Sequence, residues 1–170
     1  MISVSLGDLG ILSKGHAWTS EEDGMIKGIH HPCLIVSDLD RSVAFYRDLL
    51  GMKVTTEFES SGPFVESMQE LPDASLRLAL LEAQGDALEL IQFVSPRGKP
   101  FDRRRCDVGT THVCFEVDDI DAHYQDLQKK GVRFTTPPLL IDGGPLKGWR
   151  VVYFIDPDGI TLELMQKPAA

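Results

Sequence analysis

Hydrophobic and polar positions follow the same order in the two halves of this chain. Each half opens with a short apolar run, residues 29–36 and 111–117, which predicts a buried strand. Apolar residues then recur at helical spacing over 39–50 and 120–130, and these segments predict amphipathic helices. The remaining strands are expected at 52–58, 76–82 and 87–93 in the first half and at 132–134, 149–155 and 160–166 in the second. The pattern therefore predicts an α+β fold of two tandem βαβββ units.

Two modules of similar size account for most of the chain, and we place them at residues 28–94 and 109–167. The stretch 95–108 between them contains Pro, Gly and three consecutive arginines, which predicts a linker. Residues 1–27 are expected to form an appendage before the first module. Residues 59–74 are expected to form an irregular insertion within it.

The repeat extends to individual residues. Residues 75–92 align with 149–166 without a gap, and both segments end in Leu-Glu-Leu-(Ile/Met)-Gln. Upstream, a matching apolar stretch of each half starts with a His. Each module therefore supplies one His and one Glu, and the four residues are His31, Glu89, His112 and Glu163. Two imidazoles and two carboxylates form a ligand set that suits one divalent ion, which could be Zn, Ni, Co, Mn or Fe.

Alternation along the first strand of each module predicts where the histidines point. His31 and Cys33 share one strand face, as do His112 and Cys114. The residues between them are apolar, as expected for the face on which a helix packs. The histidines should therefore point away from the helices.

The hairpins extend this face. Glu89 and Glu163 alternate with leucines on both sides. If the turns are short, Tyr153 falls opposite Glu163 and Ala79 falls opposite Glu89. Arg77 would then lie on the ligand-bearing face together with Tyr153. We expect all four metal ligands to face one cleft, which forms within the chain or across a dimer.

Composition and charge exclude several classes of partner. Hydrophobic residues make up 42% of the chain and charged residues 25%, as in an ordinary globular protein. The formal net charge of −9 argues against binding to nucleic acid or to an anionic membrane. No apolar run approaches the roughly 20 residues of a membrane span.

The cysteines and the first residues suggest a compartment. The three cysteines do not form the pattern of a disulfide framework, which favours reduced thiols. The chain has no Lys or Arg before its first short apolar stretch, so a secretory signal is not expected. Both features predict a cytoplasmic protein.

Two motifs carry a family resemblance. The run from His31 to Gly51 and the run Asp156-Pro-Asp-Gly-Ile-Thr-Leu-Glu-Leu164 resemble the vicinal oxygen chelate superfamily of glyoxalases, bleomycin-resistance proteins and extradiol dioxygenases. The resemblance covers about residues 28–167. It implies two βαβββ modules that form a curved mixed sheet around a cleft with one metal ion, often in a homodimer. The ligand positions of the family match His31, Glu89, His112 and Glu163.

Within that superfamily, a complete His-Glu-His-Glu set is similar to glyoxalase I and to the methylmalonyl-CoA epimerase branch. The resemblance implies a metal-dependent lyase, isomerase or epimerase that acts on a small substrate with vicinal oxygens. Such an enzyme moves a proton next to a metal-chelated carbonyl. We expect Glu163 to be the base and Glu89 its partner, although the two positions are quasi-symmetric.

Three side chains are candidates for substrate contacts. Arg77 could clamp a carboxylate, or it could extend to the rim of the sheet. Tyr153 is expected on the ligand-bearing face, and Lys147 lies in a Gly- and Pro-rich loop that suits a lid. The linker arginines 103–105 could meet a phosphorylated carrier such as coenzyme A, but a solvated linker is the favoured interpretation.

Two other function classes remain open. An Fe(II) extradiol-type dioxygenase needs two His and one carboxylate, so Glu89 as a fourth ligand argues against it. A metal-free small-molecule binding or resistance protein has no use for four ligands. Metal analysis of the purified protein separates these classes.

Overall fold

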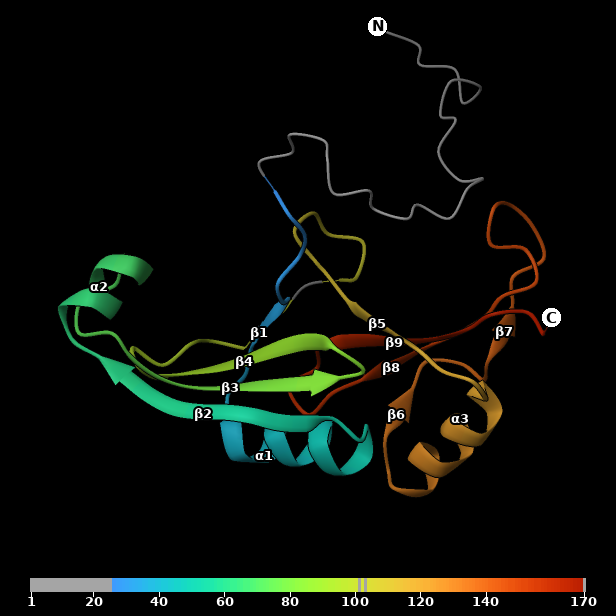
Figure 1. Ribbon diagram of the computed structural model, residues 1–170, viewed down its shortest axis with the longest axis horizontal. Helices are drawn as coiled ribbons and strands as arrows, with labels where there is room; N and C mark the ends of the chain where they lie inside the picture. Colours follow the sequence, from blue (N-terminus) through green and yellow to red (C-terminus); the bar gives the residue numbers. More distant parts are fainter. Residues whose placement is uncertain (1–25, 101, 103, 170) are drawn as a thin grey trace, which may run out of the picture.

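The computed structural model describes residues 26–100, 102 and 104–169, which form two mixed sheets next to one another (Figure 1). The first module contains β1 (Cys33–Ile35), α1 (Leu39–Ala44), a π-helical turn η1 (Phe45–Leu49), β2 (Lys53–Ser61), α2 (Pro63–Gln69), β3 (Ser75–Ala83) and β4 (Asp86–Ser95). The second contains β5 (Val113–Glu116), α3 (Ile120–Lys129), β6 (Arg133–Phe134), β7 (Leu139–Leu140), β8 (Arg150–Ile155) and β9 (Thr161–Gln166). The predicted α+β fold is confirmed. Most of the expected appendage, residues 1–25, lies outside the described residues.

Both sheets have the same strand order. The order is β1-β4-β3-β2 in the first sheet and β5-β9-β8-β6 in the second, where β7 also pairs with β8. In each sheet the first strand of the module pairs in parallel with its last strand. All other pairs are antiparallel. The duplication read in the sequence is therefore a duplication of topology.

The glutamine that closes each repeated motif holds the start of a helix. Gln92 accepts a hydrogen bond from the backbone N–H of Leu39 at 2.9 Å, and Gln166 accepts one from Ile120 at 3.0 Å. The first N–H groups of a helix have no partner within the helix. Each glutamine therefore ties its module's main helix to the last strand of the sheet. An Asp side chain caps the same helix in both modules, Asp38 in α1 and Asp119 in α3.

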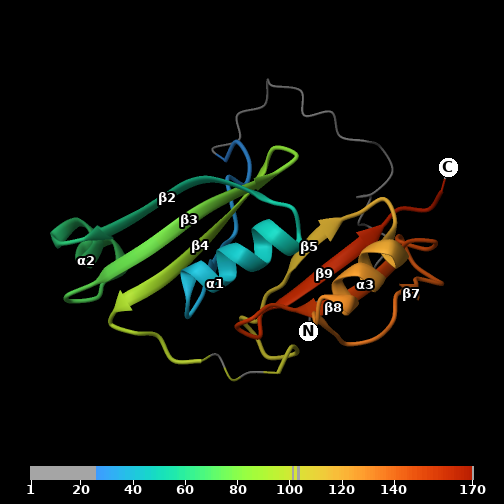
Figure 2. The ribbon, with the colours of Figure 1, turned by 90° about the horizontal axis from the view of Figure 1, so that it is seen from below.

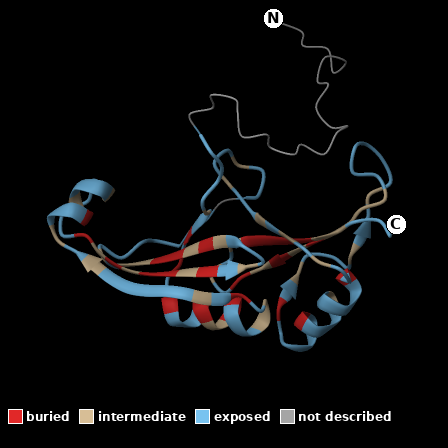
Figure 3. Cartoon of the chain, viewed as in Figure 1, coloured by how far each residue is buried: buried red, intermediate tan, exposed pale blue. Residues whose placement is uncertain are grey.

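One hydrophobic core lies between the helices and the two sheets. Helices α1 and α3 lie on the same side of the sheets in Figures 1 and 2. Buried side chains of both modules, including Tyr46, Leu90, Ile120 and Phe154, form a single cluster on that side. Figure 3 shows buried residues along the central strands and on the helices. The two modules thus share one core, which fixes their arrangement.

The segment 59–74 is not irregular, and that prediction is wrong. It contains the end of β2 and the helix α2, which begins at Pro63. Proline suits the first turn of a helix because its missing N–H would have no partner there. Val65 of α2 is buried against Leu76 and Ile91, on the sheet face opposite α1. The helix is too short for its apolar periodicity to stand out in the sequence.

The turn between β8 and β9 joins the two modules. The carboxylate of Asp158 accepts hydrogen bonds from the Ser37 N–H at 3.0 Å, the Ser37 hydroxyl at 2.5 Å and the Arg41 guanidinium at 2.5 Å. The buried Tyr46 hydroxyl donates to Asp156 at 3.2 Å. Burial opposes the charge of Asp158, but the bonds from Ser37 and Arg41 outweigh it and lower its pKa.

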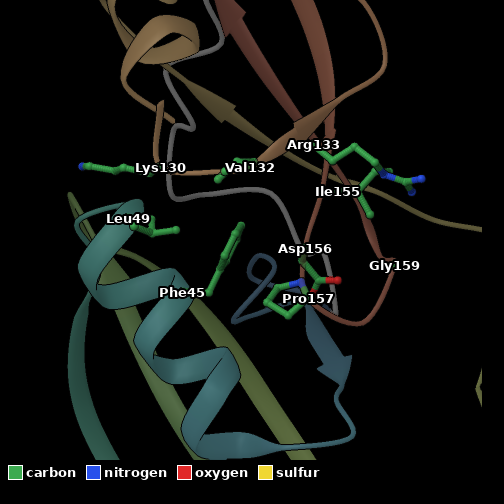
Figure 4. Close-up of a pocket in the computed structure, with 10 residues that line it drawn as sticks. Phe45, Leu49, Lys130, Val132, Arg133, Ile155, Asp156, Pro157 and Gly159 are labelled. Atoms are coloured by element: carbon green, nitrogen blue, oxygen red, sulfur yellow. The ribbon is translucent and has the colours of Figure 1, made fainter. Parts of the chain in front are cut away.

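Figure 4 shows this junction from the helix side. Around a cavity of about 430 Å³, Phe45 of the first module lies opposite Asp156 and Pro157, and Leu49 lies opposite Lys130 and Val132. Because the turn accepts hydrogen bonds from Ser37, Arg41 and Tyr46 of the first module, it holds the modules in one orientation. None of the helices in the described ranges is long and apolar enough to span a membrane.

We expect Asp158→Asn to lower the free energy of unfolding by about 1–3 kcal/mol at pH 7, because charged hydrogen bonds are lost. The pKa of Asp158 is lower in the folded chain than in the unfolded chain. Its contribution is therefore complete above the unfolded pKa of about 4 and disappears as pH falls through the folded pKa. Urea unfolding at pH 7 and pH 3 checks both points.

The matched control is Asp48→Asn, which removes an exposed carboxylate paired with its neighbour Arg47. This change should leave stability nearly unchanged at both pH values. An equal loss in the two variants would show that the turn does not hold the modules together.

Candidate functional site

The first His–Glu pair forms where β1 meets β4. The Nε2 atom of His31 lies 3.3 Å from Oε2 of Glu89. Parallel pairing places Cys33 opposite Glu89, and the Glu89 N–H donates to the carbonyl of Pro32 at 3.0 Å. The other side of the His31 ring is also held, because its Nδ1 lies 2.7 Å from Nδ1 of His30. The sheet itself therefore aims the imidazole at the carboxylate.

The second pair repeats this arrangement where β5 meets β9. The Nε2 atom of His112 lies 2.8 Å from Oε2 of Glu163, which is one of the few buried charged residues. Cys114 is the strand partner of Glu163 on one side, and Tyr153 is its partner on the other, as predicted. The Tyr153 ring meets the His112 ring edge-on, with centroids 5.4 Å apart.

Each pair has the geometry of two neighbouring ligands of one divalent ion. With metal–ligand bonds of about 2.1 Å, adjacent ligand atoms in tetrahedral or octahedral coordination lie about 3.0–3.4 Å apart. The observed N–O separations of 3.3 Å and 2.8 Å are close to this range. An imidazole nitrogen and a carboxylate oxygen are also ligand types that these ions accept. The side chains in each pair therefore fit a metal ion.

The four predicted ligands are brought together as two pairs, not as one set. Within the described ranges, no group of three or more His, Cys, Asp or Glu side chains is positioned to hold a metal ion. The pairs belong to different sheets, and the sheets lie next to one another rather than face to face (Figure 1). A single chain thus presents two half-sites.

The two repeated cysteines flank the pairs as protonated thiols. Cys33 is exposed as a whole, but partial burial of its thiol, assisted by the neighbouring Glu89, raises its pKa to about 12. Burial and Glu163 raise the pKa of Cys114 to about 12 in the same way. Each thiol can therefore donate to the adjacent glutamate at neutral pH and does not act as a thiolate.

Arg77 does not lie on the ligand-bearing face, so that prediction is wrong. Ala79 pairs with Leu90 rather than with Glu89, and Arg77 pairs with Gln92 on the helix face. The reason is the turn: the first hairpin closes with two residues between Ala83 and Asp86, whereas the second has a longer connection from Ile155 to Thr161. The register of the two hairpins therefore differs by one residue.

On the helix face, Arg77 forms ion pairs with acidic neighbours. Its guanidinium donates two hydrogen bonds to Asp40 of α1, at 2.8 and 3.0 Å, and one to Glu57 at 3.2 Å. Arg150 and Asp121 form the corresponding pair in the second module. These ion pairs join each helix to its sheet. Lys147, the third candidate for substrate contact, is exposed in the turn before β8, where its N–H bonds to the Gly144 carbonyl.

Two arginines near the second pair were not expected there. The guanidinium of Arg105 lies over the Tyr153 ring, 5.7 Å from its centroid. Arg133 is the strand partner of Ile155, so it shares the face of Tyr153 and Glu163. A cavity of about 330 Å³ opens between Arg105, His112 and Tyr153. Alternation in β6 could have indicated the side of Arg133, but the loop that carries Arg105 has no periodicity to read.

Comparison with known proteins agrees with the fold. Residues 28–164 match the model of the Glyoxalase/Bleomycin resistance protein/Dioxygenase superfamily. The chain is 32% identical over 146 residues to a 2-epi-5-epi-valiolone epimerase of Actinomyces sp., covering 83% of this chain and 80% of that protein. It is 30% identical over 141 residues to a lactoylglutathione lyase of Haemophilus influenzae, covering 81% and 91%.

A solved structure shows the same fold. The glyoxalase family protein APC24694 from Bacillus cereus superposes with a TM-score of 0.74 at 18% identity, covering 86% of this chain and 98% of the other. The chain belongs to the glyoxalase/bleomycin resistance protein/dioxygenase superfamily. The resemblance inferred from the two sequence motifs is confirmed.

The position of Arg77 leads to a prediction. Arg77→Gln should lower the thermal unfolding temperature slightly, because it removes exposed ion pairs between α1 and the sheet. It should leave Zn²⁺ binding unchanged, whereas Glu89→Gln in the same module should weaken it about 10–100-fold. Thermal unfolding and Zn²⁺ titration of both variants check this. Loss of Zn²⁺ binding in Arg77→Gln would place the arginine near the ligands after all.

Proposed function

We propose that this protein is a divalent-metal-dependent lyase, isomerase or epimerase that moves a proton next to a carbonyl of a small substrate with vicinal oxygens. The observation that carries the proposal is the pair of matching His–Glu contacts, with N–O separations of 3.3 and 2.8 Å. The lyase and the epimerase among its relatives support the same reaction class. The three cysteines are free thiols, which supports a cytoplasmic location.

The glutamates are the groups that can exchange a proton with the substrate. When bound, the ion polarises the substrate carbonyl and makes the adjacent C–H more acidic. We assign Glu163 as the base, because it is buried and His112 holds its Oε2 atom, so its Oε1 atom can take the proton. Glu89, held by His31 in the same way, supplies a different proton to the product, and exchange with solvent then restores both carboxylates.

We further propose that two copies of the chain share each metal site. One chain presents two half-sites on separate sheets, and each half-site offers only two ligands. A symmetric pair of chains can place the first half-site of one against the second half-site of the other. This arrangement assembles two complete sites per dimer, with one ion per chain.

The proton-transfer step has a direct test. Metal analysis of the purified protein should find one divalent ion per chain, and the loaded protein should exchange solvent deuterium into its substrate. Methylglyoxal–thiol adducts and 2-methyl-acyl-CoA esters are the probes. Glu163→Gln should reduce exchange about 10²–10⁴-fold, because it removes the base.

The control for this test is Glu116→Gln, which changes another strand glutamate that is exposed and paired with Lys167. Exchange in this variant should stay near that of the unmodified chain. Undiminished exchange in Glu163→Gln rules out its role as base. Oxygen uptake with a catechol would indicate a dioxygenase instead, and a purified protein without metal would indicate a binding protein.

The shared site can be tested by mixing two inactive variants. His31→Ala and His112→Ala each break both sites of their own homodimer. A mixed dimer regains one intact site, formed by the unmodified first half-site of one chain and the unmodified second half-site of the other. After subunit exchange, an equal mixture should recover about a quarter of the original activity. No recovery, despite exchange shown by differently tagged chains, would place all four ligands within one chain.

A further inference from the structure

A cavity of about 760 Å³ lies between the first strand of the first module and the second sheet. It is lined by β1, by the linker before β5, and by β6, β8 and the start of β9. Its volume is typical of a pocket for a small molecule. Three arginines, Arg104, Arg105 and Arg133, are among the lining residues. This concentration of positive charge is unusual in a chain with a net charge of −9.

Two of these arginines have no acidic partner among the described residues. Arg104 pairs with Asp107, but no carboxylate in the described ranges lies within ion-pair distance of Arg105 or Arg133. Most other arginines of the described chain are paired with Asp or Glu; they are Arg41, Arg47, Arg77 and Arg150. Two guanidinium groups that face one cavity without compensation favour an anionic occupant.

The cavity is continuous with the surroundings of the second His–Glu pair. Arg105, Thr111 and Thr161 also line the smaller cavity that reaches His112 and Tyr153. Arg133 pairs with Ile155, and Ile155 pairs with Thr161, so all three share one sheet face. In Figure 4 the guanidinium of Arg133 points away from Lys130 and lies on the side of Ile155.

We propose that this cavity is an anion-binding pocket in which Arg105 and Arg133 recognise a carboxylate or phosphate group of the substrate. The arginines approach from different elements, since one belongs to the linker and the other to β6. Contact with the Tyr153 ring orients Arg105 beside the second half-site. The identification of the occupant as the substrate rests on the proposed function. The pocket adds that this substrate carries an acidic group. The linker arginine is then a binding residue and not a solvated one.

Binding of simple anions to the metal-free protein tests the pocket separately from the metal chemistry. The full chain is treated with a chelator and titrated calorimetrically at low salt with inorganic phosphate and, in a second series, with malonate. We expect saturable binding at one site per chain. Arg105→Gln and Arg133→Gln should each weaken it about tenfold or more, because each removes a charged hydrogen-bond donor. The anion that binds more tightly identifies the acidic group.

The matched control is Arg97→Gln, which removes the same charge from an exposed linker residue that does not line the cavity. It should change the affinity by less than about twofold, since a distant exposed charge is screened. Arg133→Lys, which keeps the charge, should recover part of the affinity. The proposal is overturned if anion binding is not saturable, or if Arg97→Gln loses as much anion affinity as the two pocket variants. Because no metal is present, either result leaves the proposed proton transfer untouched, and loss of metal-dependent exchange leaves the pocket untouched.

Discussion

The parallel pairing of the first and last strands in each module is the constraint on which the site depends. It places a His at the start of one strand beside a Glu in the middle of the other, at 3.3 Å in the first module and 2.8 Å in the second. Each His lies just before its strand, whereas each Glu lies within one. The backbone hydrogen bonds that hold the sheet therefore also position each Glu and the strand that follows each His.

The sequence predicts the parts of this structure that depend on local alternation and on duplication. The predicted strand faces of Cys33 and Tyr153 are correct, because period-2 alternation records them directly. Arg77 was misplaced because the face of a hairpin residue also depends on turn length, and a difference of one residue moves it to the other face. The short helix α2 was missed because it has too few turns for a periodic pattern.

The arrangement of the two modules could not be predicted from local alternation or from the duplication. Whether two duplicated sheets face each other or lie next to each other depends on contacts distant in sequence, such as those of Asp158 with Ser37 and Arg41. The turn Asp156–Gly159 is part of a family motif in the sequence. The motif does not reveal that the turn packs against the first helix. The side-by-side arrangement separates the ligand pairs and also creates the cavity that Arg105 and Arg133 line.

The repeated Leu-Glu-Leu-(Ile/Met)-Gln motif combines two duties in five residues. The glutamate faces the His of its half-site, while the glutamine, three positions later, faces the helix and receives its first N–H. An odd spacing puts the two side chains on opposite faces of one strand. Inserting or deleting one residue between them would force one of the two out of place: either a charge would enter the apolar layer or the helix would lose its anchor. The spacing of Glu and Gln therefore links the site to the fold, because a one-residue shift that displaced the glutamate would also disrupt the contact between strand and helix.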